Sequence, residues 1–415
     1  MPPVDQPGPR RLSRVAARRL VARPALAAAA ASAVLAAAVL PAAQAEAATV
    51  KANVTSPAVP VAGDLTAVSA LSASNAWAVG RVQAGSGWAG LAEHWNGTKW
   101  AARSVPAPTG SGDVYLNGVT AIGAGNVWAV GYSVNASSQA GHTLTEHWNG
   151  KAWAVVPSPS PKVSSNSVLL SVSAVSAGNV WAAGYYDDST GTPVGLIEHW
   201  NGSSWQRVTA AVPTNGYAIQ LESVSARSAS DVWIAGDYLE SGAELTLIEH
   251  WNGTKWTVMT SPDGAGSPDS ELHGITAVSG TDAWATGFYF AGSTYLSLVE
   301  HWNGHAWKTV TSANPSGSTD TYLYGVSADS ASDAWSVGYW YKSNAGYKTL
   351  TEHWNGHAWA VVASPDPAGI TSNYLYGVSA VSGQAAVASG YDFGTADQAL
   401  AERWNGTKWA IQPLG

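Results

Sequence analysis

Short runs of alternating apolar and polar residues follow one another along most of the chain. Residues 116–121 read Leu-Asn-Gly-Val-Thr-Ala, and residues 127–132 read Val-Trp-Ala-Val-Gly-Tyr. Gly, Asn, Asp, Ser and Pro gather between such runs. Alternation with a period of two, bounded by turn-forming residues, predicts half-buried β-strands. The pattern therefore predicts an all-β fold.

The strands recur in units that each carry Trp-Asn-Gly after a glutamate, with a second tryptophan following the glycine. The seven glutamates are Glu93, Glu146, Glu198, Glu249, Glu300, Glu352 and Glu402, which lie 53, 52, 51, 51, 52 and 50 residues apart. A period near 50 built from short strands is typical of a propeller. We expect a seven-bladed β-propeller with four antiparallel strands per blade.

Each unit begins with an apolar inner strand, near residues 65, 116, 169, 221, 272, 323 and 375. The second strand carries a tryptophan in six units, whereas the seventh has Val387. Asn-Gly between the third and fourth strands is a strong hairpin signal. A two-residue loop would place Trp95 opposite Thr98 and Glu93 opposite Trp100; a bulged loop would shift that register by one.

The first 45 residues have the features of a secretory signal peptide. Six arginines precede an alanine-rich apolar run at residues 25–40, and Ala43-Gln44-Ala45 supplies small residues for cleavage. The run is shorter than the roughly 20 residues that a membrane-spanning helix needs. We expect a secreted, extracellular protein with no stable membrane insertion after cleavage, in which residues 46–62 form an N-terminal segment and residues 63–415 form the propeller.

The charge of the expected mature chain argues against nucleic acid as a partner. Removing residues 1–45 takes six of the 20 basic residues and one of the 28 acidic ones, so the net charge is 14 minus 27, or −13. Cysteine is absent, which excludes thiol nucleophiles and thiolate metal sites. We expect no cofactor and no metal site, and a monomer.

The unit resembles the kelch repeat of galactose-oxidase-type propellers, because strand two ends in Gly-aromatic and strand three leads into a turn and a tryptophan. Kelch repeats have two glycines where this chain has one, as at Gly80 and Gly131. The Gly-x-x-Trp ending is also similar to the Asp-box of sialidase-type repeats, with a tryptophan such as Trp95 in place of the Asp. The resemblance implies a propeller of secreted bacterial proteins; the copper and cysteine chemistry of galactose oxidase is excluded.

Residues that repeat in every blade are interpreted as scaffold. The seven glutamates, and the histidines that follow six of them, would lie on separate blades, whereas catalysis needs different groups converging on one place. We expect each glutamate to accept a hydrogen bond from a Trp N–H or a backbone amide.

Positions that vary within the repeat are better candidates for a site. The second residue of the inner strand is Thr66, Asn117, Leu170, Glu222, His273, Tyr324 and Tyr376 in the seven units. From these we predict Asn117, Glu222, His273, Tyr324 and Tyr376 as ligand-binding residues at one mouth of the channel, because their donors, acceptors and flat rings suit a sugar. Loops after strand two add Trp88, Tyr186, Asp188 and Trp340.

The sequence therefore favours a non-catalytic propeller that binds carbohydrate or a cell-surface partner through the channel-mouth face. A polysaccharide-degrading enzyme, either a glycoside hydrolase or a lyase, is the alternative, with His273, Glu222, Tyr324 and Tyr376 at its site. A structural envelope or matrix protein is the third possibility. None of the common serine-hydrolase, zinc-protease, phosphate-loop or calcium-loop motifs occurs in the chain.

Val50–Ser56 resembles the outermost strand of the other units and would add to the last blade to close the ring. If so, removing residues 46–57 lowers the melting temperature of the mature chain, measured by circular dichroism. An unchanged melting temperature would remove this closure hypothesis.

Overall fold

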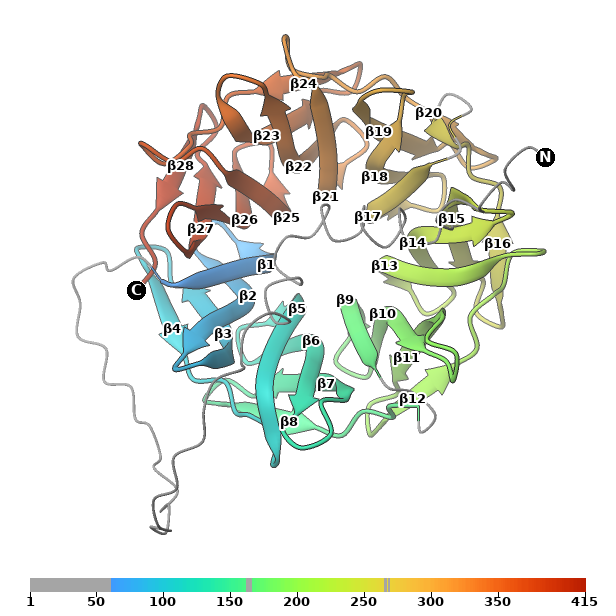
Figure 1. The fold of residues 1–415 in the computed structure, drawn as a ribbon, viewed down its shortest axis with the longest axis vertical. Helices are drawn as coiled ribbons and strands as arrows, with labels where there is room; N and C mark the ends of the chain where they lie inside the picture. The colour runs from blue at the N-terminus through green and yellow to red at the C-terminus, as the bar shows by residue number, and fades with distance from the viewer. Residues whose placement is uncertain (1–60, 162–165, 265–266, 268) are drawn as a thin grey trace, which may run out of the picture. The chain divides into compact units, whose positions relative to one another are not determined.

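The chain folds into a seven-bladed β-propeller, as expected. The structure is a computed structural model that describes residues 61–161, 166–264, 267 and 269–415. Within them, seven antiparallel sheets of four strands stand around a central axis (Figure 1). Each sheet is built from one repeat unit, and its strands follow in sequence order from the axis outward.

The innermost strands are β1 (Gly63–Ser72), β5 (Ser111–Gly123), β9 (Ser167–Ser176), β13 (Tyr217–Ser228), β17 (Ser270–Ser279), β21 (Asp320–Ser330) and β25 (Asn373–Ser382). The second strands are β2 (Asn75–Ala84), β6 (Asn126–Asn135), β10 (Asn179–Asp187), β14 (Asp231–Glu240), β18 (Asp282–Phe290), β22 (Asp333–Lys342) and β26 (Ala385–Phe393). The third strands are β3 (Gly87–Trp95), β7 (Gly141–Trp148), β11 (Pro193–Trp200), β15 (Ala243–Trp251), β19 (Tyr295–Trp302), β23 (Gly346–Trp354) and β27 (Asp397–Trp404). The short outer strands are β4 (Trp100–Arg103), β8 (Trp153–Val156), β12 (Trp205–Val208), β16 (Trp256–Met259), β20 (Trp307–Thr309), β24 (Trp359–Val362) and β28 (Trp409–Gln412).

Two predictions for the N-terminus, the signal peptide over residues 1–45 and the closing strand over Val50–Ser56, lie outside the described residues. In the part of the chain that is described, no helix has the length and apolar character needed to cross a bilayer.

Neither the two-residue hairpin nor the bulged loop is found between strands three and four. Trp95 pairs with Trp100 and Glu93 with Ala102, so the loop spans four residues. The Asn96 side chain explains the longer loop, because its oxygen accepts the amides of Thr98 and Lys99, each at 3.0 Å, and Gly97 takes a φ of +94°. The register moves by two residues, so both tryptophans and the glutamate still share one face.

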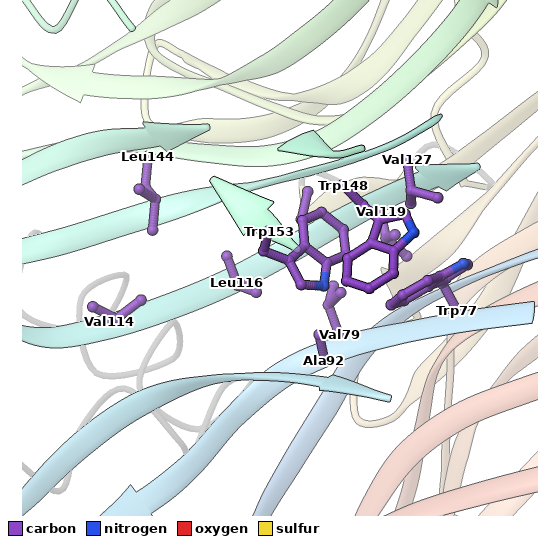
Figure 2. Close-up of a cluster of buried hydrophobic side chains, with 11 residues drawn as sticks. Trp77, Val79, Ala92, Val114, Leu116, Val119, Val127, Leu144, Trp148 and Trp153 are labelled. Atoms are coloured by element: carbon purple, nitrogen blue, oxygen red, sulfur yellow. The ribbon is translucent and has the colours of Figure 1, made fainter. Parts of the chain in front are cut away.

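The core lies between blades and is made largely of tryptophan. Trp77 of the first blade packs against Trp148 and Trp153 of the second, with ring centroids 4.9 and 5.3 Å apart (Figure 2). The same three-ring contact recurs at the next five interfaces. Burying one such ring contributes about 5 kcal/mol gross, so these contacts carry much of the cohesion between blades.

The histidines that follow six of the seven motif glutamates pack against the strand-two tryptophans of the same blades. His94 stacks on Trp77 at 4.5 Å, and its Nε2 lies 3.0 Å from the Asn75 side-chain oxygen in the turn between β1 and β2. Five further blades repeat this arrangement with Asn or Asp as the partner. The histidines are therefore spread around the ring, one to a blade.

The two ends of the described chain join the last blade to the first. The Ala399 amide donates to the Val61 carbonyl at 2.9 Å, and the Ala102 amide donates to the Gly415 carbonyl at 3.0 Å. Leu414 is buried in the cluster that contains Trp100, and the C-terminus accordingly lies beside β4 in Figure 1. Both ends thus close the ring through backbone hydrogen bonds and one apolar anchor.

The seventh unit departs from the repeat because its interface is this closure. Val387 replaces the strand-two tryptophan and packs in the same cluster as Trp95 of the first blade. Arg403 replaces the histidine, lies 4.3 Å from the Trp95 ring centroid and donates to the Ala73 carbonyl at 2.7 Å. A cation over an aromatic ring thereby takes the place of the ring stack found elsewhere.

The single strand-two glycine faces a β-bulge in the innermost strand. Leu272 pairs with Gly287 and Gly274 with Thr286, so His273 between them is the extra residue. All seven blades have this bulge, with the glycine opposite the residue before it. A side chain at the glycine would overlap a carbonyl oxygen of the inner strand, that of Glu271 in the case of Gly287. The glycine is therefore what allows the bulge.

We expect Gly287→Ala to destabilise the fold by about 3 kcal/mol, because backbone must move to admit the methyl group. Gly123→Ala is the matched control, since a Cβ at Gly123 meets nothing within 4 Å. Urea unfolding of both variants checks the prediction, and equal stability of the two would contradict it.

Candidate functional site

One face of the propeller carries the loops from strand two to strand three and from strand four to the next inner strand. In each antiparallel sheet, successive strands run in opposite directions, so the connections between them alternate between the two faces. The loops after strand two and after strand four therefore lie on the same face. We call it the mouth face. The Asn-Gly loops lie on the opposite face.

The seven positions predicted from their variability are the bulge residues. Thr66, Asn117, Leu170, Glu222, His273, Tyr324 and Tyr376 each lie where the inner strand has one residue more than its partner. A bulge residue is released from the pleat and can be turned toward its neighbours around the channel. Their equivalence in the fold is thus real, and their different chemistry is local to each blade.

The bulge residues of the first three blades serve the scaffold. Thr66 donates to the Leu116 carbonyl at 2.7 Å, and Asn117 donates to the Leu169 carbonyl at 2.8 Å. Leu170 is buried. The side-chain amide of Asn117, which was predicted as a ligand-binding residue, therefore donates a hydrogen bond to the next blade.

The bulge residues of the last four blades lie in one continuous run, which we call the mouth tract: Glu222, His273, Tyr324 and Tyr376. His273 Nδ1 lies 3.7 Å from a Glu222 oxygen, and the His273 ring is 4.6 Å from that of Tyr324. Tyr324 meets Tyr376 edge to face at 5.0 Å. The structure thus brings four of the five predicted inner-strand residues together.

His273 is held by carboxylates on both sides. Its Nε2 lies 3.1 Å from a Glu271 oxygen, opposite the Glu222 contact at Nδ1. Burial by itself would lower the pKa of His273, but the hydrogen bond to Glu271 and the charges of Glu222 and Glu271 outweigh it and raise that pKa to about 9. The imidazole is therefore a cation at neutral pH with both nitrogens directed at carboxylates.

Tyrosines extend the mouth tract across the last three blades. The Tyr324 and Tyr339 hydroxyls are 3.2 Å apart, and Tyr376 stacks on Tyr391 with centroids 5.9 Å apart. Buried aromatic rings form the base of this cluster: Phe288, Tyr324, Tyr339, Tyr374 and Tyr391. Partly buried rings lie against it: Tyr295, Tyr322, Tyr347 and Tyr376. Burial raises the pKa of Tyr374 to about 12, so its phenol remains a hydrogen-bond donor.

Sequence reasoning missed Glu271, Tyr322 and Tyr374. Each lies two residues before a bulge residue, and a spacing of two on a strand was the signal that could have found them. Phe288 and Tyr339, which directly follow the strand-two glycine, pack between blades and also form the floor beneath the mouth tract.

Trp88 belongs to a different cluster, on the first two blades. The Arg81 guanidinium lies 4.2 Å from the Trp88 ring centroid and 5.5 Å from that of Tyr115. Arg81 also contacts Asp64 at 2.7 Å and Asp397 at 3.7 Å. Trp88 therefore covers a buried ion pair that helps to join the first blade to the last.

The other three predicted loop residues do not join the mouth tract. Trp340 packs against the buried cluster around Trp284. Asp188 is half-buried, and its carboxylate accepts the Thr190 amide at 2.8 Å and the Thr192 amide at 3.0 Å, which makes it a turn-forming residue. Tyr186 lines a separate crevice at the outer edge of the third blade.

Among the described residues, no group of three or more His, Asp or Glu side chains is placed to hold a metal ion. What the mouth tract and the adjoining Glu271 offer together is an imidazolium, two carboxylates and several phenol rings and hydroxyls. These groups can accept hydrogens from hydroxyl groups, donate to oxygen and stack on apolar ring faces.

No protein family and no curated protein matches the chain. Solved structures that resemble it include an ulvan lyase of polysaccharide lyase family PL25 bound to a GlcA–Rha3S unit, with a TM-score of 0.53 at 9% identity over 85% of this chain and 96% of that one. A protein of unknown function from Dyadobacter fermentans has a TM-score of 0.50 at 10% identity, over 85% and 96% of the two chains. The SapL1 lectin with α-methyl fucoside has a TM-score of 0.45 at 13% identity, over 86% and 97%.

These likenesses show the fold. At identities of 9 and 10%, the ulvan lyase and the Dyadobacter fermentans protein resemble this chain in fold alone and carry no residue of their sites over to it.

The seven motif glutamates are fully buried, one in each blade. Serine hydroxyls of the preceding loop bind four of them, as Ser158 does with Glu198 at 2.7 Å. Backbone amides contribute as well, for instance that of Ala211 to Glu249 at 2.9 Å. The indoles of the third strand, expected as donors, bind turn carbonyls instead, as Trp95 does with Ala73.

Glu93 and Glu146 have no hydrogen-bond partner among the described residues. In the four blades whose glutamate binds a serine, that serine comes from the blade that precedes the glutamate in the ring. Its position is occupied by Leu414 of the seventh blade for Glu93 and by Val105 of the first blade for Glu146. Burial raises the pKa of Glu146 from its ordinary 4.5 to about 8. It does the same for Glu93, Glu249, Glu300 and Glu402, against the pull of Arg103 on Glu93 and of hydrogen bonds on the other three.

The raised pKa values predict a fold that loses stability as the pH rises. The folded state holds protons on these glutamates that the unfolded chain has released above pH 4.5, so the stabilisation is fully present below that value and is lost as the pH rises to about 8. Melting temperatures measured from pH 4.5 to 9 should fall and then level off.

Glu146→Gln should flatten this profile, because the amide cannot ionise, and should melt higher than the parent at pH 8.5. Glu240→Gln, which removes a carboxylate from the end of β14, is the control for charge alone. A melting temperature that rises with pH across this range would refute the assignment.

Proposed function

We infer that this protein binds carbohydrate at the mouth face, through the mouth tract. The observation that carries the inference is the contact between Glu222, His273, Tyr324 and Tyr376, four equivalent positions of four successive blades. The scaffold requires a bulge there but no particular side chain, since Thr66 and Leu170 serve in other blades. The scaffold therefore does not explain why a carboxylate, an imidazole and two phenols lie together in the mouth tract. Binding of a polar ligand with apolar ring faces would explain it.

The accessible part of the tract suits a sugar. Tyr376 is half-buried, and the Glu271 side chain is 20% exposed, so a ring and a carboxylate oxygen are within reach of solvent. A pyranose has C–H faces that stack on aromatic rings and hydroxyls that donate to carboxylates. A cell-surface glycan or a free polysaccharide both present these groups.

His273 is poorly placed to act as a general base. An imidazolium whose two nitrogens both face carboxylates has no lone pair with which to take a proton from a substrate. The mouth tract therefore lacks the base that a lyase or hydrolase built on His273 would need.

We propose further that the repeat is a divergent kelch-like or Asp-box-like unit and that the protein is secreted. The strand-two glycine and the Asn-Gly loop support the first point, and the signal-peptide features of residues 1–45 support the second. Amino-terminal sequencing of the protein recovered from culture medium tests the export and the cleavage site.

Glycan-array binding by the mature chain tests the proposed function. Tyr376→Ala removes a half-buried ring, and Tyr324→Phe removes a hydroxyl while retaining the buried ring. Loss of one ring or hydrogen-bond contact, on the order of 1.5 kcal/mol, weakens binding about tenfold. Asp188→Asn is the control, since Asp188 lies in an exposed turn away from the tract.

Melting temperatures of the variants exclude unfolding as the cause of a loss. Absence of binding to every glycan on the array would overturn the carbohydrate assignment. Binding that survives both tyrosine changes would move the site away from the mouth tract, and product release from a bound polysaccharide would favour the enzyme.

A further inference from the structure

A second candidate site lies on the third blade, at the outer edge of β11. A crevice of about 230 Å³ opens beyond the end of the short strand β12, where β11 has no outer partner. Tyr186 and Arg207 line it together with Leu196, Ile219 and the loop residues 209–212. This crevice is distinct from the mouth tract, whose residues come from the fourth to seventh blades.

In most blades a side chain or carbonyl closes this edge. The amide three residues before the motif glutamate donates to Ser160 at 2.9 Å in the second blade and to Asp263 at 2.9 Å in the fourth. The fifth, sixth and seventh blades use Asn314, Asp366 and the Val61 carbonyl. We call this acceptor the edge cap.

The third blade has lost the edge cap. Its corresponding amide belongs to Gly195, and the capping position, seven residues after the tryptophan that begins the fourth strand, is Val212. The Val212 side chain has no acceptor atom and is exposed, since the residue is 63% accessible to solvent. Among the described residues no acceptor is recorded for the Gly195 amide, and Gly195 lines the crevice.

The first blade also has a glycine at this place, but no room. A side-chain atom at Gly90 would already meet Val105, whose side chain occupies the space. The second blade has a crevice of about 190 Å³, yet its polar groups are joined to one another through Thr143, Ser158 and Ser160, and it carries Ser133 and Val155 where the third blade has Tyr186 and Arg207. The third blade therefore combines a crevice, the Gly195 amide and the charged side chain of Arg207.

Arg207 supplies the charge. Its guanidinium lies 5.1 Å from the Tyr186 ring centroid and makes no ion pair within 4 Å among the described residues. The nearest carboxyl by strand pairing is that of Glu198, which is fully buried and bound to Ser158. Burial raises the pKa of the Glu198 carboxyl, whereas the Ser158 hydrogen bond and the charge of Arg207 lower it, but Arg207 makes no ion pair within 4 Å in the described part of the chain. An arginine beside an aromatic ring with no such contact is suited to bind a carboxylate from outside.

We propose that this crevice binds a uronic acid residue of an acidic polysaccharide. The ligand carboxylate takes the place of the edge cap, accepting the Gly195 amide as Asp263 accepts that of Thr246, with its charge toward Arg207. The sugar ring lies against Tyr186 and the apolar wall formed by Leu196 and Ile219. The volume is below the roughly 300–1,000 Å³ of sites for drug-sized ligands, which limits the occupant to one small ring.

The backbone beside the crevice is consistent with a ligand clamp. Asn215 and Ala218 both have positive φ, 63° and 53°, and alanine rarely adopts that region. Between them Tyr217, the first residue of β13, is 44% exposed. Strain of this kind is characteristic of segments that position a ligand.

The test compares sodium glucuronate with glucose, which has the same ring without the carboxylate, by saturation-transfer NMR and calorimetry on the mature chain. We expect glucuronate to bind at least about tenfold more tightly, because hydrogen bonds to a charged group are worth about 1.5–3 kcal/mol. Arg207→Gln should abolish this preference. Val212→Asn, which restores an edge cap like that of the fifth blade, should block binding and leave the melting temperature at or above that of the parent.

Val361→Asn is the matched control, because Val361 is an exposed valine, 44% accessible, on the fourth strand of another blade. Tyr376→Ala should leave glucuronate binding unchanged, which separates this site from the mouth tract. Glucuronate binding by a chain that recognises no glycan on the array would sink the proposed function and retain this one.

Equal affinity for glucuronate and glucose would overturn the proposal, as would binding that is indifferent to both Arg207→Gln and Val212→Asn. Binding of N-acetylaspartate amide as tight as that of glucuronate would overturn the sugar assignment in favour of an acidic peptide.

Discussion

Contact between the tryptophan of one blade and the pair of tryptophans of the next is the interaction on which this propeller depends. Each sheet has only four strands and its outer strand has three or four residues, so no blade can bury enough apolar surface by itself. The three-ring contact, as between Trp77, Trp148 and Trp153, supplies that burial at the boundary between blades. With no disulfide available, cohesion of the ring rests on these contacts and on the hydrogen bonds around them.

The same dependence explains the irregular last blade. In a ring of repeats, the first and last blades meet without a chain segment that connects them. At this interface Val387 and Arg403 replace the tryptophan and the histidine. Arg403 reaches a carbonyl and a ring of the first blade, while Val61 and Gly415 supply backbone acceptors. A departure from the repeat is thus sometimes structural, and must be located in the fold before it is interpreted as a site.

Other departures have no structural demand behind them. The bulge opposite the strand-two glycine frees one side chain per blade from the pleat, and the scaffold accepts Thr, Asn or Leu there. In the last four blades that freedom is used to assemble an imidazolium between carboxylates beside a floor of tyrosines. At the edge of the third blade, loss of the cap opens a crevice with an arginine at its side. Both sites arise by relaxing a requirement that the other blades obey.

The sequence by itself determined the number of blades, the order of their strands and the positions at which variation is informative. It could do so because the alternation of apolar and polar residues indicates which face of each strand is buried. The repeat of about 50 residues also identifies equivalent positions in different blades before any contact is known. Only the tertiary structure decided which informative positions act together. Asn117 binds the next blade while His273 meets Glu222 and Tyr324, and Tyr186 and Trp340 do not join the mouth tract. The bulge residues that contact one another lie about 50 residues apart in the chain. The local sequence pattern predicts neither the β-bulges that bring them together nor the uncapped edge of the third blade.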